Sequence, residues 1–208
     1  MSKNINLDKI RSLDVFFSAD ISFFAFIEKW SINGIGKALT DSCCKLPVHV
    51  GWFVNVMGGL KIFEMAEDKN DHGVMRLTEN HISKYDNNGW FGDRIVAVKR
   101  FAMFEDPALR AHVEAKIIGD EASGNVLYDI KELFDFPGFH WLHQMFPESK
   151  NKTICSGYVR QVIQSLGYDF PINHGATIAP YDIYNSDKIF SDETGLVSNF
   201  SFVPDIYV

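Results

Sequence analysis

The sequence predicts an α+β protein with a central antiparallel sheet packed against helices. Strand-like patterns cluster between residues 48 and 101, and a Gly58-Gly59 hairpin signal lies among them. Helical patterns stand before and after this cluster instead of alternating with its strands. The 208 residues, 46% of them hydrophobic, suit a single domain. We expect its core over about residues 13–190, followed by a turn-rich C-terminal tail.

The strands are predicted from short runs and alternations of apolar residues. Residues 67–73 form a polar turn after the hairpin, and residues 80–86 are ambiguous. Because Gly58-Gly59 joins two apolar runs directly, we expect the flanking strands to pair. The expected strands cover residues 13–18, 48–56, 60–66, 74–77 and 94–101.

The best-marked helix covers residues 106–118. Asp106 is placed to cap it, Pro107 occupies its first turn, and Gly119 is expected to end it. From residue 175 onward the chain is rich in turn signals. Further helices are expected at 21–39, 128–134, 138–146 and 155–166, the last of these ending at Gly167.

Charge and hydropathy exclude several classes of protein. The net charge is −7, and no basic stripe with interleaved aromatic residues is present, which argues against a nucleic-acid partner. The polar start of the chain lacks the layout of a secretory signal, and no apolar run is long enough to span a bilayer. We therefore expect a soluble, cytoplasmic protein without stable membrane insertion; its oligomeric state is left open.

Cys155 is the strongest candidate for chemistry. The chain has three cysteines, two of them adjacent (Cys43 and Cys44), which does not resemble a disulfide framework. Cys155 opens a predicted helix, where the backbone dipole and free N–H groups favour the nucleophilic thiolate. The alternative is a small buried hydrophobe, the commoner fate of a lone cysteine.

A cysteine nucleophile needs a base, and His49 and Glu64 form a candidate pair. His49 lies in the predicted strand 48–56, and Glu64 lies in the strand expected to return beside it. A carboxylate next to an imidazole fixes its tautomer and supports its protonated form. Glu67 and Asp68 are nearby competitors further into the turn. A structural histidine and an exposed glutamate are the alternatives.

Four motifs in this order resemble the permuted NlpC-type, papain-like hydrolases, with the YiiX/YebB-like group nearest. They are Asp14-Val15-Phe16-Phe17, Pro47-Val48-His49-Val50-Gly51, Ile62-Phe63-Glu64 and Cys155-Ser156. Softer matches are Gly73-Val74-Met75-Arg76-Leu77, Tyr128-Asp129 and Ala179-Pro180-Tyr181-Asp182-Ile183-Tyr184, so the resemblance covers about residues 13–190. The chain departs from the family pattern at Leu13, where a glycine is usual, and at Gly157, where a glutamate is usual.

The resemblance implies a circularly permuted papain-like fold and a Cys-His-Glu triad. Cys155 would be the nucleophile, His49 the base and Glu64 the third member. The expected activity is thiol hydrolysis of an amide (peptide or isopeptide) or ester bond in a peptide, peptidoglycan-like or acyl substrate, through an acyl-enzyme. No cofactor or metal is expected. The alternatives are an inactive binding module on the same fold and a lipid acyltransferase or acyl hydrolase.

Two metal-binding readings compete with this interpretation. Residues 68–79 nearly fit a calcium loop, but His72 stands where an oxygen ligand is needed and strands are expected on both sides. His140 and His143 lack a third ligand at useful spacing. We interpret the first as a turn and the second as a packed or solvent-facing pair. His174 lies in a loop and is given no role.

Overall fold

A computed structural model describes residues 5–19, 47, 49–67, 74–85, 94–128, 152–171, 178–191 and 197–206. The helices are α3 (Pro107–Ser123), α5 (Cys155–Gln164) and α6 (Pro180–Asn185), with short 3-10 turns η1 (Leu7–Lys9), η2 (Ile82–Tyr85) and η3 (Ala102–Glu105). The strands are β1 (Val15–Ala19), β2 (His49–Val56), β3 (Gly59–Glu67), β4 (Met75–Asn80), β5 (Arg94–Phe101), β6 (Leu127–Tyr128), β7 (Lys152–Thr153), β8 (Tyr168–Asp169), β9 (Lys188–Ser191) and β10 (Val197–Phe202).

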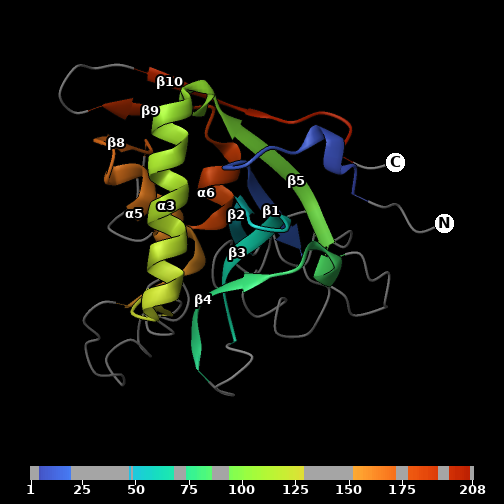
Figure 1. The fold of residues 1–208 in the computed structure, drawn as a ribbon. Coiled ribbons are helices and arrows are strands. Elements are labelled where there is room, and N and C mark those ends of the chain that lie inside the picture. Colours follow the sequence, from blue (N-terminus) through green and yellow to red (C-terminus); the bar gives the residue numbers. More distant parts are fainter. Residues whose placement is uncertain are drawn as a thin grey trace, which may run out of the picture.

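The described strands form one ten-stranded sheet in the order β7-β6-β4-β3-β2-β1-β5-β10-β9-β8 (Figure 1). Neighbouring strands are antiparallel except for β6 and β7. The described part of the chain is therefore α+β with a large antiparallel sheet, as the sequence predicts. The five expected strands correspond to β1 to β5, of which β4 runs further than predicted, to Asn80.

Apolar layers cover both faces of the sheet near its centre. One face packs against α3, α5 and α6 in the main core. On the other face Phe16, Phe53 and Ile62 pack against Ile82 and Tyr85 of η2. Because both faces are covered, β1 is buried along its whole length, which agrees with the consecutive apolar residues at its start.

The β2–β3 hairpin sets the geometry around His49. Gly58 and Gly59 have φ values of 106° and 118°, which glycine adopts without strain. The register places Gly51 opposite Glu64. His49 lies two residues from Gly51 and so on the same face of the sheet as Glu64. The hairpin predicted from the sequence is confirmed.

Gly51 allows a close approach beside this pair, and Gly51→Ala is expected to destabilise the fold. A Cβ at Gly51 would lie 2.6 Å from the Phe16 ring and 2.7 Å from the backbone oxygen of Phe63. We expect a loss of about 1–3 kcal/mol in urea unfolding, the usual cost of overpacking. The control is Gly119→Ala in α3, where a Cβ meets nothing within 4 Å and a gain of up to about 1 kcal/mol is expected. Equal stabilities for the two variants would contradict this.

The start of α3 is as predicted, and its predicted end is wrong. The Asp106 carboxylate accepts hydrogen bonds from the backbone N–H groups of Ala108 (2.8 Å) and Leu109 (3.3 Å). The helix passes through Gly119 and ends at Ser123, and Gly124 follows with a φ of 65°. A single glycine inside a helix costs only about 1 kcal/mol. The left-handed residue that follows the last turn is what ends the helix.

Two other expectations need correction, and one ambiguous segment is resolved. The tail after residue 175 contains α6, β9 and β10, and β10 pairs with both β5 and β9, so the sheet extends past residue 190. Tyr128, expected to start a helix, lies in β6, where pairing with β4 and β7 extends the chain. The ambiguous segment 80–86 contains η2. The helices expected at 21–39 and 138–146, and residues 129–134, lie outside the described residues.

A buried lysine ties α6 to the sheet. Lys99, 2% exposed, donates to the backbone oxygen of Ser186, at the C-terminal end of α6. Its ammonium lies 4.7 Å from the ring centre of Phe200 and 4.5 Å from that of Phe202. Burial lowers its pKa to about 8, although the charge of Asp187 opposes the shift. The positive charge is therefore held by helix carbonyls and aromatic faces.

Candidate active site

Cys155 is the first residue of α5, as the sequence predicts. Its side chain is 5% exposed and forms no disulfide. Ile154 caps the helix in an extended conformation without a side-chain hydrogen bond. The N–H groups of the first turn have no partner within the helix and point along its axis. The sulfur therefore lies where the backbone favours negative charge.

Two buried contacts fix the start of α5. The Ser156 hydroxyl, fully buried, donates to the backbone oxygen of Ile178 at 2.6 Å, which anchors the helix to the segment before α6. Two residues later the Tyr158 hydroxyl donates to Asp120 of α3 at 2.9 Å. The helix also packs against β2, so the thiol is held against the strand that carries His49.

His49 and Glu64 form a hydrogen-bonded pair at one end of β2. His49 Nε2 lies 2.9 Å from Glu64 Oε2. The His49 side chain is 21% exposed, whereas that of Glu64 is fully buried. The Phe16 ring packs near the imidazole, with centroids 6.1 Å apart. The proximity of His49 and Glu64 expected from the hairpin is confirmed.

His49 interacts with Cys155 as well as with Glu64. Burial by itself lowers the pKa of His49. The charge of Cys155 and its hydrogen bond to His49 oppose burial, and so do the hydrogen bond and charge of Glu64. Together they outweigh burial and raise the pKa of His49 to about 10. Because Glu64 engages Nε2, Nδ1 is the ring nitrogen left for the sulfur. Cys155 and Glu64 therefore both favour the protonated, positively charged form of His49.

Two further residues hold Glu64 and were not singled out in the sequence. Asn80 Nδ2 donates to Glu64 Oε1 at 2.8 Å, and the Tyr85 hydroxyl donates to Glu64 Oε2. Glu64 lies opposite Thr78 in the β3–β4 pair. Asn80 is two residues after Thr78, so it lies on the same face of the sheet as Glu64, on the other side of it from His49. The sequence sign that could have indicated Asn80 is a pair of polar residues two positions apart in a strand, Thr78 and Asn80, and both are buried. Tyr85 lay in the ambiguous segment.

The competing candidates that the structure describes do not join this cluster. Glu67 lies at the exposed end of β3. Glu79, part of the near-calcium pattern, forms an ion pair with Lys61 at 3.2 Å. Among the described residues there is no group of three side chains able to hold a metal ion. Cys43, Cys44, Asp68, His72, His140, His143 and His174 lie outside the described residues.

The arrangement has the parts needed for acyl transfer. A thiol at a helix start touches an imidazole, and a buried carboxylate orients that imidazole. In the part of the chain that the structure describes, no helix is both long and apolar enough to cross a membrane. Comparison of the sequence with protein-family models and with curated proteins finds no match.

Proposed function

We propose that this chain is a thiol hydrolase that cleaves an amide (peptide or isopeptide) or ester bond through an acyl-enzyme. Cys155 is the nucleophile, His49 carries the proton and Glu64 orients His49. The observation that carries the proposal is the position of His49, with Cys155 on one side and the buried Glu64 on the other. A purely structural histidine needs no thiol at a helix start beside it.

The order of the elements supports the finer fold assignment in this proposal. The histidine strand comes first, the glutamate strand follows in the same hairpin, and the helix that begins with the cysteine comes later. This is the order of a circularly permuted papain-like fold of the NlpC type. The antiparallel sheet with α5 packed on β2 is compatible with that arrangement.

The proposed reaction has two halves. The Cys155 thiolate attacks the carbonyl carbon, and the carbonyl electron pair moves to oxygen. As the oxyanion collapses, the bond to the leaving nitrogen or oxygen breaks and the His49 imidazolium gives its proton to the leaving group. A thioester remains on Cys155. Neutral His49 then removes a proton from water, the hydroxide displaces the thiolate, and the acid product leaves.

The start of α5 contributes to the same reaction. The negative oxygen of the tetrahedral intermediate needs donors that are already in place, and the backbone N–H of Cys155 is one such donor. Because Ser156 and Tyr158 anchor the helix, this N–H does not have to reorganise as charge develops.

Selective alkylation of Cys155 tests the proposal. We expect iodoacetamide at about pH 6 to modify Cys155 far faster than an ordinary thiol, because a neighbouring cation and a helix start both make a thiol more reactive. Peptide mapping by mass spectrometry would locate the label. Incubation with p-nitrophenyl esters or peptide arylamides should add an acyl group to Cys155 and release the leaving group, and Cys155→Ser should lose both the rapid alkylation and the turnover.

The matched control is the Cys43→Ser/Cys44→Ser double variant, which should keep both properties. Labelling that persists in Cys155→Ser and disappears in the double variant would refute the assignment of the nucleophile. Rapid alkylation of Cys155 without acyl transfer from any ester or amide would identify a binding module on this fold, and the hydrolase proposal would be wrong.

A further inference from the structure

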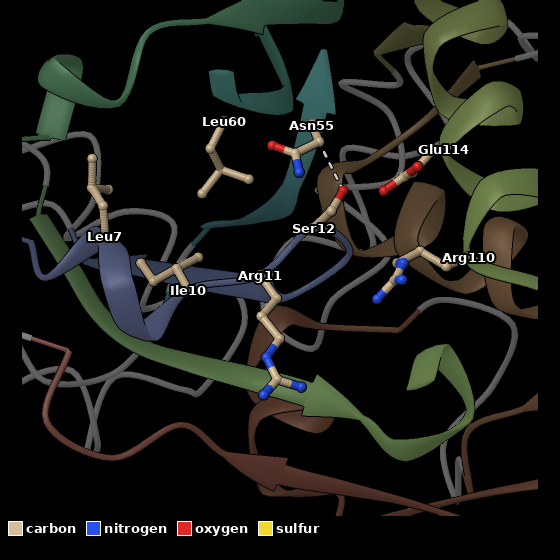
Figure 2. Close-up of a pocket in the computed structure, with 8 residues that line it drawn as sticks. All are labelled: Leu7, Ile10, Arg11, Ser12, Asn55, Leu60, Arg110 and Glu114. Carbon is tan, nitrogen blue, oxygen red and sulfur yellow. Dashed lines mark hydrogen bonds between the residues drawn. The ribbon is translucent and has the colours of Figure 1, made fainter. Parts of the chain in front are cut away.

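A second site lies at the far end of β2 from His49. A pocket of about 560 Å³ opens between the 7–12 segment, the β2–β3 hairpin and the first turns of α3 (Figure 2). His49 and Asn55 are six residues apart on an extended strand, so this pocket lies roughly 20 Å from the imidazole. Its volume is in the range of small-molecule sites, about 300–1,000 Å³.

One side of the pocket is apolar. Leu7, Ile10 and Leu60 line this side, and Figure 2 shows them facing the two charged residues of α3. Leu7 is 50% exposed and lies on the rim of the cleft. Ile10 is 7% exposed, so Leu7 and Leu60 are the side chains that offer contact to an aliphatic group of a ligand.

The other side carries one positive and one negative charge that are not used by the fold. Arg11 also lines the pocket, but its guanidinium is paired with Glu105 at 2.7 Å. Arg110 and Glu114, one turn apart on α3, form no side-chain hydrogen bond or ion pair with the described residues, including each other. Figure 2 shows both pointing from α3 toward the cleft. A ligand that satisfies both must itself carry both signs of charge.

A buried hydroxyl adds a directed donor. Ser12 is 9% exposed, and its oxygen accepts the backbone N–H of Asn55 at 2.8 Å. Its own proton has no acceptor among the described residues. Figure 2 places Ser12 between the aliphatic side and the charged side, where that proton can be donated to an anionic oxygen of a ligand.

We propose that this pocket binds a free α-amino acid with an aliphatic side chain. Arg110 pairs with its carboxylate, which also accepts the Ser12 proton. Glu114 pairs with its ammonium group. The side chain lies against Leu7 and Leu60. A simple anion would leave Glu114 facing a like charge, and an apolar ligand would desolvate both charges without a partner. The proposal does not depend on the proposed hydrolase function.

Calorimetric titration of the full chain with L-leucine tests this. Leucine should bind saturably, and N-acetyl-leucine and leucinamide should each bind at least about tenfold more weakly. In Arg110→Gln, leucine and leucinamide should bind equally, because the carboxylate has lost its partner. In Glu114→Gln, leucine and N-acetyl-leucine should bind equally.

The controls separate this site from the candidate active site. Glu121→Gln, on the same helix but away from the pocket, should bind leucine like the unmodified chain. Cys155→Ala should also bind leucine normally, so failure of the hydrolase proposal would leave this result untouched. Three results would overturn the proposal: no binding of leucine to the unmodified chain up to about 10 mM, equal binding of leucine and N-acetyl-leucine by the unmodified chain, or unchanged leucine affinity in both Arg110→Gln and Glu114→Gln.

Discussion

Replacing His49 with glutamine should slow alkylation of Cys155 at about pH 6 by roughly 100-fold or more, because the thiolate loses its adjacent cation. Glutamine can still accept or donate hydrogen bonds, but it carries no positive charge. Turnover of any ester or amide substrate should fall at least as steeply, since the same residue also protonates the leaving group. The rates are measured by mass spectrometry over a series of pH values.

The pKa of His49 predicts how turnover should change with pH. The pKa of His49 is raised to about 10 in the fold, so the imidazolium is present below that pH and is lost above it. Turnover should therefore fall as pH rises through about 10, when the proton donor disappears. Alkylation of Cys155 needs only the thiolate and should not fall over the same range.

The matched control is His81→Gln. His81 is an exposed histidine that hydrogen-bonds Ser83, and its replacement should leave alkylation and turnover unchanged. If His49→Gln alkylates as fast as the unmodified chain at about pH 6, then His49 does not activate the sulfur. In that case the proposed mechanism is wrong.

Removing the Glu64 side chain should cost about 3–5 kcal/mol of unfolding free energy, the usual penalty for breaking a buried charge network. The carboxylate is fully buried and accepts hydrogen bonds from His49, Asn80 and Tyr85. In Glu64→Ala these donors face a cavity instead of an acceptor, and each buried, unsatisfied donor costs about 1–3 kcal/mol. Urea unfolding measures the loss.

Two variants define what the Glu64 result means. Glu64→Gln keeps the shape and one acceptor oxygen, so its loss of stability should be smaller, while its amide no longer supports the imidazolium and turnover still drops. Glu79→Ala removes a surface carboxylate that is 39% exposed and paired with Lys61, and should change stability by at most about 1 kcal/mol. Equal losses in Glu64→Ala and Glu79→Ala would show that the network does not stabilise the fold.

The sequence was sufficient where local chemistry decides the structure. Gly58-Gly59 identified the hairpin and with it the closeness of His49 and Glu64. Asp106 followed by Pro107 marked the start of α3. These signals act over a few residues, so tertiary packing had little opportunity to override them.

The sequence was insufficient where partners come from distant strands. Asn80 and Tyr85 meet Glu64 only after β4 has paired with β3 and η2 has folded over the sheet. The strand β10 is stabilised by pairing with β5, far away in the chain. Leu13 has a φ of 67°, which favours glycine, yet it is buried at 1% exposure. Packing holds Leu13 in that conformation.

The separation of Cys155 from His49 along the chain has a consequence for folding. The hairpin with His49 and Glu64 is a local unit, whereas α5 must dock on β2 from a distant part of the sequence. Docking over such a loop is a slow step in folding. A chain in which α5 has not docked would therefore carry a thiol of ordinary reactivity, and a rise in the reactivity of Cys155 would report that folding is complete.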